Sequence, residues 1–426
     1  MKIRPLYFLV RNKKLILIYF SSITIQIIII LIFQVNNWVS QHAINTPWFM
    51  FLMNTLEPYS DYKYWYQGFA RQFFYDDWLP YFDYSSNPDR YKNFLLYLID
   101  IILGNQKLSF IYPPFFFYSI IIPAAININL VFIPLFLANI LLPIVVYKFL
   151  INFASKKVAE WGFVATALSP LSIFYNGGLF FNTSYVTLFF IIALYFVSKK
   201  KFTWAIFFLS VACLFKQTII FFFPPFLIYI VLQSTEKKSR RVYSIYFKNF
   251  LKYTGMLIGM LFLGSIPWII ITPKNYIQSL LVEQSINFNP DFNAPEYNNP
   301  VNWYSFLINF GAPYWLIYLL GFLTFTFIGL LIIEIVAIFL LYNWDRKNKL
   351  DWIKFLDIIV YTAFISHLFF PRGVYKYYFT LHVPLIILWI CFHFKEKLTD
   401  NNSIRKVWLL LFVFISFLIL SLLVFG

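Results

Sequence analysis

The sequence predicts an all-α polytopic membrane protein, a bundle of about 11 transmembrane helices with a long first extracytoplasmic loop. Three observations support this fold class. Hydrophobic residues make up 61% of the 426 residues and charged residues only 12%, unlike soluble globular proteins. Apolar runs of about 20 residues, long enough to cross roughly 30 Å of hydrocarbon, recur along the chain. Lysine and arginine cluster between these runs, as they do at cytoplasmic helix ends.

The apolar runs give the expected positions of the spans. They lie near residues 14–34, 130–151, 158–175, 179–197, 202–215, 217–232, 253–272, 313–341, 356–370, 376–393 and 407–425. With a cytoplasmic N-terminus, the basic segments all fall on the cytoplasmic side if residues 110–151 make one net crossing. The stretch FIYPPFFFYSIIIPAA, residues 110–125, is then re-entrant or interfacial, as its paired prolines and short length allow. If it crosses fully, the later basic loops turn outward unless a further crossing compensates.

Cysteine content, net charge and motifs exclude several classes. Cys213 and Cys391 lie inside apolar runs, so neither a disulfide framework nor a metal cluster is expected. The net charge of +16 does not indicate nucleic-acid binding, because the basic residues gather at predicted helix ends. The first apolar run has no small-residue cleavage site after it, which predicts a retained span rather than a signal peptide. Walker and Rossmann motifs are absent from the sequence, so it gives no support to ATP or nicotinamide chemistry.

The acidic residues gather in two loops that the topology places outside the cytoplasm. The first loop, residues 35–110, holds a large share of the 18 acidic residues, and the second loop, residues 274–312, holds three more. Acidic residues contribute little to membrane orientation, so this asymmetry favours chemistry at the outer face. Apart from spans and loops, residues 1–426 are expected to form a single domain without an internal repeat.

Asp61 lies in the aromatic stretch SDYKYWYQG of the first loop. Aromatic faces pack against sugar rings, but they also line membrane interfaces. On this stretch alone, an interfacial aromatic belt with a solvated aspartate is the better explanation. The alternative is a general base beside a sugar site, where a positioned carboxylate takes a proton from a hydroxyl group.

Three cations lie at predicted outer helix ends, where the positive-inside tendency disfavours them: Lys216, Arg372 and Lys376. A lysine at a helix end can snorkel to the interface, which explains one such cation more easily than three. Together they could bind a phosphate group through charge-assisted hydrogen bonds and stabilise it as a leaving group. His382, one turn further on, is more often a satisfied core residue than a ligand. The pair Gly177–Gly178 is expected to form the turn between two spans.

The order of these motifs resembles the GT-C superfamily, membrane glycosyltransferases that use a polyprenyl-phosphate sugar as donor. SDYKYW, LPYFD and IYPPF follow the first span and are similar to elements of GPI mannosyltransferase I and its prokaryotic relatives. GGLFFNTS and FKQTIIFFFPP are more similar to the dolichyl-phosphate-glucose-dependent glucosyltransferases of N-glycan assembly. The resemblance covers residues 1 to about 230. Gly178 stands where the glycan-assembly enzymes have histidine, which leaves the sugar and the subfamily open.

The resemblance implies an inverting transferase whose base is an acidic residue of the first outer loop. In this sequence that residue is Asp61, which would deprotonate the acceptor hydroxyl for attack on the anomeric carbon. Lys216, Arg372 and Lys376 are assigned to the donor phosphate from their positions rather than from a motif. The residues expected to contact the sugar or the acceptor are Tyr62, Trp65, Arg71, Asp83, Asn182 and Gln217.

The predicted function is therefore transfer of mannose or glucose from a polyprenyl- or dolichyl-phosphate sugar to a lipid-linked glycan or glycolipid. The site would face the non-cytoplasmic side of a prokaryotic cell membrane or of the endoplasmic reticulum membrane. Its partners would be these two lipid-linked substrates and the surrounding lipids, with no nucleic acid. No cofactor or metal is required, although Asp76, Asp77 and Asp83 could supply oxygen ligands for a divalent ion.

Three alternatives share the apolar composition. A transporter or flippase of lipid-linked sugars would be expected to show repeated halves, broken helices in matching positions and polar residues near the midplane. The polar residues identified above gather at one face instead. An oligosaccharyltransferase catalytic subunit would need a soluble C-terminal domain with a Trp-Trp-Asp motif, whereas this chain is expected to end in a membrane span. A catalytically inactive subunit of similar shape stays open.

Overall fold

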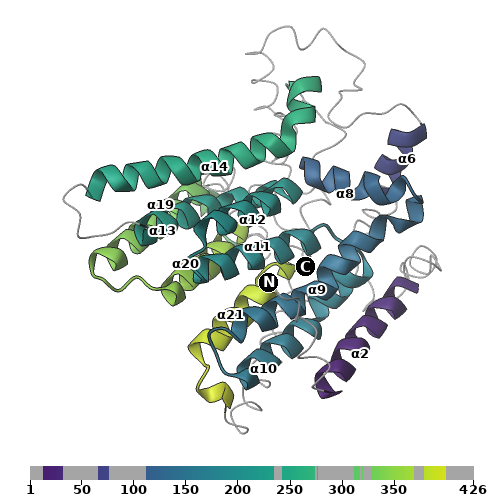
Figure 1. Cartoon of the computed structure of the whole chain (residues 1–426), viewed down its shortest axis with the longest axis horizontal. Helices are drawn as coiled ribbons and strands as arrows, with labels where there is room; N and C mark the ends of the chain where they lie inside the picture. Colours follow the sequence, from purple (N-terminus) through teal and green to yellow (C-terminus); the bar gives the residue numbers. More distant parts are fainter. Residues whose placement is uncertain are drawn as a thin grey trace.

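The computed structural model describes residues 13–31, 66–75, 112–234, 242–273, 276, 311–316, 319, 328–368 and 379–399. Within these ranges every regular element is a helix, which confirms the predicted all-α fold class. The elements are α2 (Lys13–Ile30), α6 (Gln67–Tyr75), α8 (Pro114–Ala124), η5 (Ile128–Val131), α9 (Phe132–Leu150), α10 (Lys156–Ala167), η6 (Ser172–Gly178), α11 (Thr183–Ser198), α12 (Phe202–Phe215), η7 (Gln217–Phe222), α13 (Phe223–Ser234), α14 (Val242–Ile271), α19 (Ile328–Arg346), α20 (Trp352–Leu368), α21 (His382–His393) and η10 (Lys397–Thr399). They form one bundle, with α14 lying along α12 and α13 (Figure 1).

The predicted span 158–175 is broken in two. Ser155 caps the start of α10, because its Oγ accepts a hydrogen bond from the amide of Val158 at 3.4 Å. The helix ends shortly before Pro170, which lacks an amide hydrogen and disfavours the helical conformation of Ser169. The chain continues as the short π-helix η6.

A sharp bend of 114° joins η6 to α11. The left-handed residue of this bend is Phe180, with φ 60°, a conformation that bulky residues rarely adopt. The pair Gly177–Gly178 ends η6 with negative φ values, so its predicted role as the turn is wrong. The glycines instead allow close packing, since a Cβ atom on Gly177 would overlap Gln26 of α2, and one on Gly178 would overlap Ile29.

The basic helix ends gather at one end of the bundle. Lys199, which follows α11, donates a hydrogen bond to Asn152 Oδ1 at 3.0 Å. Lys157 of α10 donates to the carbonyl oxygen of Thr399 at 3.3 Å. The first contact connects the ends of α9 and α11, and the second connects η10 to the start of α10. We call this end of the bundle the basic end.

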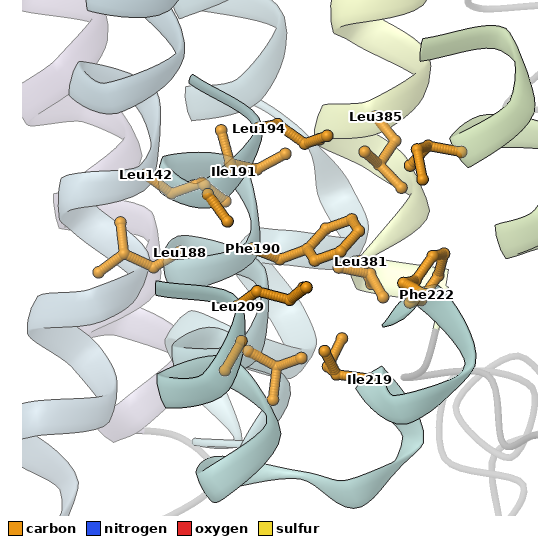
Figure 2. Close-up of a cluster of buried hydrophobic side chains, with 14 of the residues drawn as sticks. Leu142, Leu188, Phe190, Ile191, Leu194, Leu209, Ile219, Phe222, Leu381 and Leu385 are labelled. Atoms are coloured by element: carbon orange, nitrogen blue, oxygen red, sulfur yellow. The ribbon is translucent and has the colours of Figure 1, made fainter. Parts of the chain in front are cut away.

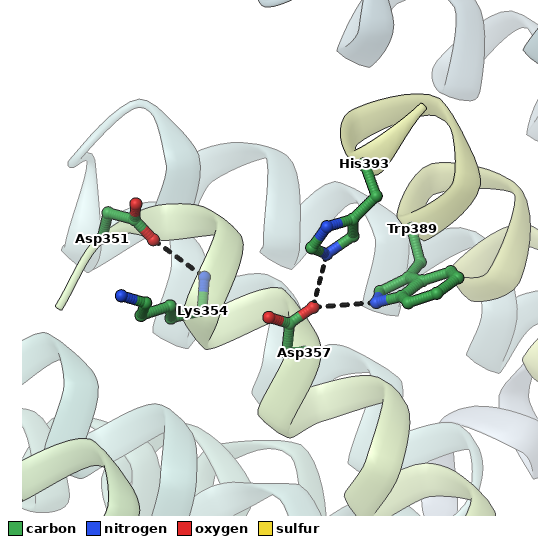
Figure 3. A network of polar contacts seen from close by, with 5 residues as sticks. All are labelled: Asp351, Lys354, Asp357, Trp389 and His393. Carbon is green, nitrogen blue, oxygen red and sulfur yellow. Dashed lines mark hydrogen bonds and ion pairs between the residues drawn. The ribbon is translucent and has the colours of Figure 1, made fainter. Parts of the chain in front are cut away.

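A polar network ties α20 to α21 near the basic end (Figure 3). Asp357 accepts hydrogen bonds from Trp389 Nε1 at 2.8 Å and from His393 Nε2 at 2.6 Å. Asp351 caps the start of α20 by accepting from the amide of Lys354 at 2.9 Å. The network therefore fixes the position of α20 relative to α21. It lies near the basic end, away from the predicted site.

The helix α8 lies at the opposite end of the bundle. Its Phe115 ring lies 5.8 Å from Phe215 at the end of α12, and its Phe117 ring lies 5.4 Å from Trp268 near the end of α14. A helix of 11 residues is about 16 Å long, roughly half the thickness of the hydrocarbon layer. This length and position support a re-entrant or interfacial segment at residues 110–125, which stays a prediction.

Four of the described helices are long and apolar enough to cross a membrane, or up to five if the bent pair of η6 and α11 forms one span. The molecule thus has the apolar helices of an integral membrane protein, while the number of about 11 spans stays a prediction. The predicted span 407–425 and most of the loops 35–110 and 274–312 lie outside the described residues.

An apolar core holds the end of the bundle opposite the basic end (Figure 2). Phe190 of α11 lies between η7 and α13, with ring centroids 4.7 Å from Phe222 and 5.6 Å from Phe226. Leu381 and Leu385, from the start of α21, are buried in the same core cluster. This packing fixes η7 against α11, and it also fixes the position of Lys216, the residue that precedes η7.

Candidate functional site

Lys216 precedes η7, and it is one of the predicted site residues whose position the structure describes. It follows α12 directly, with extended backbone angles (φ −156°, ψ 120°), before η7 begins. Its side chain is only 4% exposed, and its Nζ donates a hydrogen bond to Asn182 Oδ1 at 3.4 Å. An ammonium group is costly to bury in an apolar interior, so a buried lysine at this position is typical of a functional site.

Aromatic stacking explains why the sequence brings these two residues together. The Phe215 ring stacks on Tyr185 at 4.3 Å and on Phe189 at 5.4 Å, both from α11. Because Phe215 immediately precedes Lys216, the stack fixes the end of α12 against the start of α11. Asn182 lies at that start, within reach of the lysine.

The bend before α11 adds further buried polar groups. Thr183 Oγ1 donates to Asn176 Oδ1 at 2.6 Å, and Ser184 Oγ donates to the carbonyl oxygen of Phe181 at 2.9 Å. All four residues are buried. The sequence analysis did not assign a role to Asn176 or Thr183. The feature of the sequence that could have indicated these residues is the group of polar residues in YNGGLFFNTS, which separates two apolar runs.

The arrangement around Lys216 is suited to binding an anion. Its hydrogen bond to Asn182 is longer than the about 2.7–2.9 Å of charge-assisted pairs, and a phosphate oxygen is a stronger acceptor than an amide carbonyl. The buried position also lowers the local dielectric constant, which strengthens attraction between the ammonium group and an anion. Gln217, the next residue, is half-buried at the start of η7.

The other predicted site residues lie outside the described part of the chain. These are Asp61, Tyr62, Trp65, Asp83, Arg372 and Lys376. Arg71 belongs to α6, which packs against α8 and η5, but its side chain also lies outside the description. The structure thus brings Lys216 and Asn182 together, with Gln217 beside them, and the remaining assignments stay predictions.

His382 has the surroundings of a core residue. It is 1% exposed, and its Nε2 lies 3.0 Å from the carbonyl oxygen of Ala363 in α20. The rings of Phe364 and Phe379 lie 4.8 Å and 5.1 Å from the imidazole. Such packing is that of a histidine buried in the core, the first of the two roles considered for it.

A second polar cluster lies in the middle of the bundle and was missed by the sequence analysis. Asn139 of α9 donates hydrogen bonds to Gln26 Oε1 at 3.1 Å and to the carbonyl oxygen of Ser172 at 3.2 Å. Gln26 Nε2 in turn donates to Ser22 Oγ at 3.2 Å. The adjoining cavity has a volume of about 10 Å³, far too small for a sugar. The signal in the sequence was a single amide in each of two apolar runs.

Among the described residues, no group of three or more His, Cys, Asp or Glu side chains could hold a metal ion. The acidic triplet Asp76, Asp77 and Asp83 lies outside them. No protein-family model matches the chain, and no curated protein is significantly similar to it.

Proposed function

We propose that this protein is an inverting hexosyltransferase of the GT-C type, with several membrane spans and its site at the end of the bundle opposite the basic end. Its donor is a polyprenyl- or dolichyl-phosphate mannose or glucose, and its acceptor is a lipid-linked glycan or glycolipid. With the basic end in the cytoplasm, the site faces the non-cytoplasmic side of the membrane.

One observation carries the proposal: Lys216 is a buried cation that approaches an amide oxygen at the membrane end of the bundle where a lipid phosphate would lie. A soluble substrate would not require a cation beneath an apolar surface. A lipid-linked phosphate would, since its isoprenoid chain stays in the bilayer and its head group meets the helix ends.

The reaction follows from the assigned roles. Asp61 accepts the proton of the acceptor hydroxyl, and the oxygen bonds to the anomeric carbon of the donor sugar as the bond from that carbon to the phosphate oxygen breaks. The polyprenyl phosphate leaves with the bonding electron pair. Lys216, together with Arg372 and Lys376, stabilises the negative charge that develops on it.

The test is transfer of radiolabelled hexose from synthetic polyprenyl-phosphate mannose and glucose into a membrane lipid extract. Purified protein should transfer one of the two sugars. Asp61→Asn should lower the rate by about 10²- to 10⁴-fold, the usual contribution of a general base. Asp89→Asn, which removes a carboxylate without an assigned role from the same loop, should leave the rate unchanged. Full transfer by Asp61→Asn would remove Asp61 from the mechanism.

The second candidate is a transporter of lipid-linked sugars, and the cluster of Ser22, Gln26 and Asn139 is the observation in its favour. These polar residues lie near the middle of their helices, beside the broken pair of η6 and α11, as transporter sites often do. Their hydrogen bonds and the small cavity favour a structural role instead. Reconstituted vesicles that move the labelled lipid without consuming it would select the transporter.

A further inference from the structure

A glutamate lies within α19, a helix that otherwise continues as an apolar run. Glu334 is preceded by GLLII and followed by IVAIFLL. Trp344, further along the helix, lies under Lys354 Nζ at 5.7 Å and marks the level of the basic end. Ten residues of α-helix separate Glu334 from Trp344, a rise of about 15 Å. This rise is half the thickness of a hydrocarbon layer of roughly 30 Å, so the span predicted for residues 313–341 would place Glu334 close to the midplane.

The side chain of Glu334 faces the packed side of α19. Ala337 and Leu341, one and two turns further on, are 4% and 0% exposed and lie on the same face, which packs against α13 and α20. Leu331 and Ile335, beside the glutamate on the other face, are 60% and 56% exposed. Glu334 is half-buried at the edge between these two faces.

No described residue satisfies this carboxyl group. Its Oε2 atom is buried and accepts no hydrogen bond, and no ion pair to Glu334 occurs within the described ranges. An ionised carboxylate in this position would have lost its hydration shell without gaining a partner.

The described side chains of α13 and α20, the two helices that pack most closely on α19, supply no counter-charge. The titratable side chains described on α13 and α20 are Tyr229, Lys354, Asp357 and Tyr361. Tyr229 stacks on Phe355 at 4.1 Å, Asp357 is bonded to Trp389 and His393, and Tyr361 is 56% exposed. Lys354, the one cation among the four, lies at the level of Trp344. On α19 itself, Tyr342, Asp345 and Arg346 lie two turns or more from the glutamate.

We propose that Glu334 is a proton-binding site inside the membrane and that it carries its proton at neutral pH. Protonation removes the charge that neither the bilayer nor a neighbouring side chain stabilises, and it allows α19 to cross the membrane as a neutral helix. The inference does not depend on the proposed transferase activity, because it rests on contacts of α19 that are separate from those of Lys216.

The first test is infrared spectroscopy of the protein in phosphatidylcholine vesicles at pH 7. The difference spectrum between the wild type and Glu334→Gln should show the loss of a carbonyl stretching band of a protonated carboxyl group. Loss of carboxylate bands instead would overturn the proposal. Because glutamine has nearly the same volume and no charge, the variant should fold, and its melting temperature in detergent verifies this.

The second test is labelling with dicyclohexylcarbodiimide, an apolar reagent that enters the bilayer. A protonated carboxyl group adds to it: the acid proton goes to a nitrogen atom, the carboxylate oxygen bonds to the central carbon, and nothing leaves. Mass spectrometry should find the adduct on Glu334 at pH 7 and lose it at high pH. Glu160, which lies 3.7 Å from Lys156 at the basic end, is the internal control and should stay unlabelled. Labelling of Glu334 by a water-soluble carbodiimide alone would place it in water and overturn the proposal.

Discussion

At the residue scale, Lys216 is a buried cation, and replacing it separates function from stability. Lys216→Met keeps a long apolar chain and removes the charge. Because an apolar side chain of similar length avoids the desolvation cost of a buried ammonium group, we expect an equal or higher melting temperature in detergent. A hydrogen bond to a charged group contributes about 1.5–3 kcal/mol, so kcat/KM for the lipid-phosphate donor should fall about 10- to 150-fold.

Two further variants control this prediction. Lys216→Arg keeps the positive charge and should retain a higher kcat/KM for the lipid-phosphate donor than Lys216→Met. Lys354→Met removes a half-buried cation at the basic end, over the Trp344 ring and away from the donor site, and should leave kcat/KM unchanged. A large drop in the melting temperature of Lys216→Met, with kcat/KM preserved in the folded fraction, would assign Lys216 a purely structural role.

The sequence showed Lys216 but not the polar residues around it, for a physical reason. A charged side chain inside an apolar run is energetically unfavourable at most depths of a membrane. The lysine in LFKQTII therefore indicates a functional site whichever way the helix is oriented. An uncharged amide such as Gln26 or Asn139 is tolerated in a span, in a loop or at a helix end. Only the tertiary structure shows that these two amides meet across 113 positions of sequence.

At the element scale, the glycine pair determines how closely α2 packs on η6. Gly178→Ala would place a methyl group against the Ile29 side chain close to its backbone, so α2 must move. We expect a loss of about 1–3 kcal/mol, the usual effect of overpacking. Chemical denaturation in mixed micelles would measure it. Gly255→Ala in α14, where a new Cβ meets no atom within 4 Å, should be neutral or stabilising by up to about 1 kcal/mol. Equal losses in both variants would contradict the packing role.

The element boundaries show what apolar runs can and cannot predict. The runs gave the positions of α2, α9, α11 and α12 closely, because an uninterrupted apolar stretch in a membrane has little alternative to a helix. They did not predict the break after α10 or the bend at Phe180. A Ser-Pro pair is compatible with a kinked span or a broken one, and the packing of α2 against the glycines decides between the two.

At the scale of the whole molecule, most of the described lysine and arginine residues lie at the basic end of the bundle, and this asymmetry makes a prediction about topology. The basic end should lie in the cytoplasm, and α8 should not cross the membrane. Residues on both sides of α8 should therefore share one aqueous compartment. Cys213 and Cys391 are buried, so single cysteines added elsewhere can be labelled selectively with a membrane-impermeant maleimide.

Ser109→Cys and Asn129→Cys, which flank α8, should both react in intact cells or sealed vesicles of native orientation. Lys156→Cys, whose parent side chain is 69% exposed at the basic end, should react only after the membrane is permeabilised. Because α8 is about half as long as the hydrocarbon layer is thick, we expect it to bring the chain into the membrane and back rather than across. Labelling of Ser109→Cys and Asn129→Cys from opposite sides would mean that α8 spans the membrane. The sides of the membrane assigned to Lys216 and to the basic end would then have to be revised.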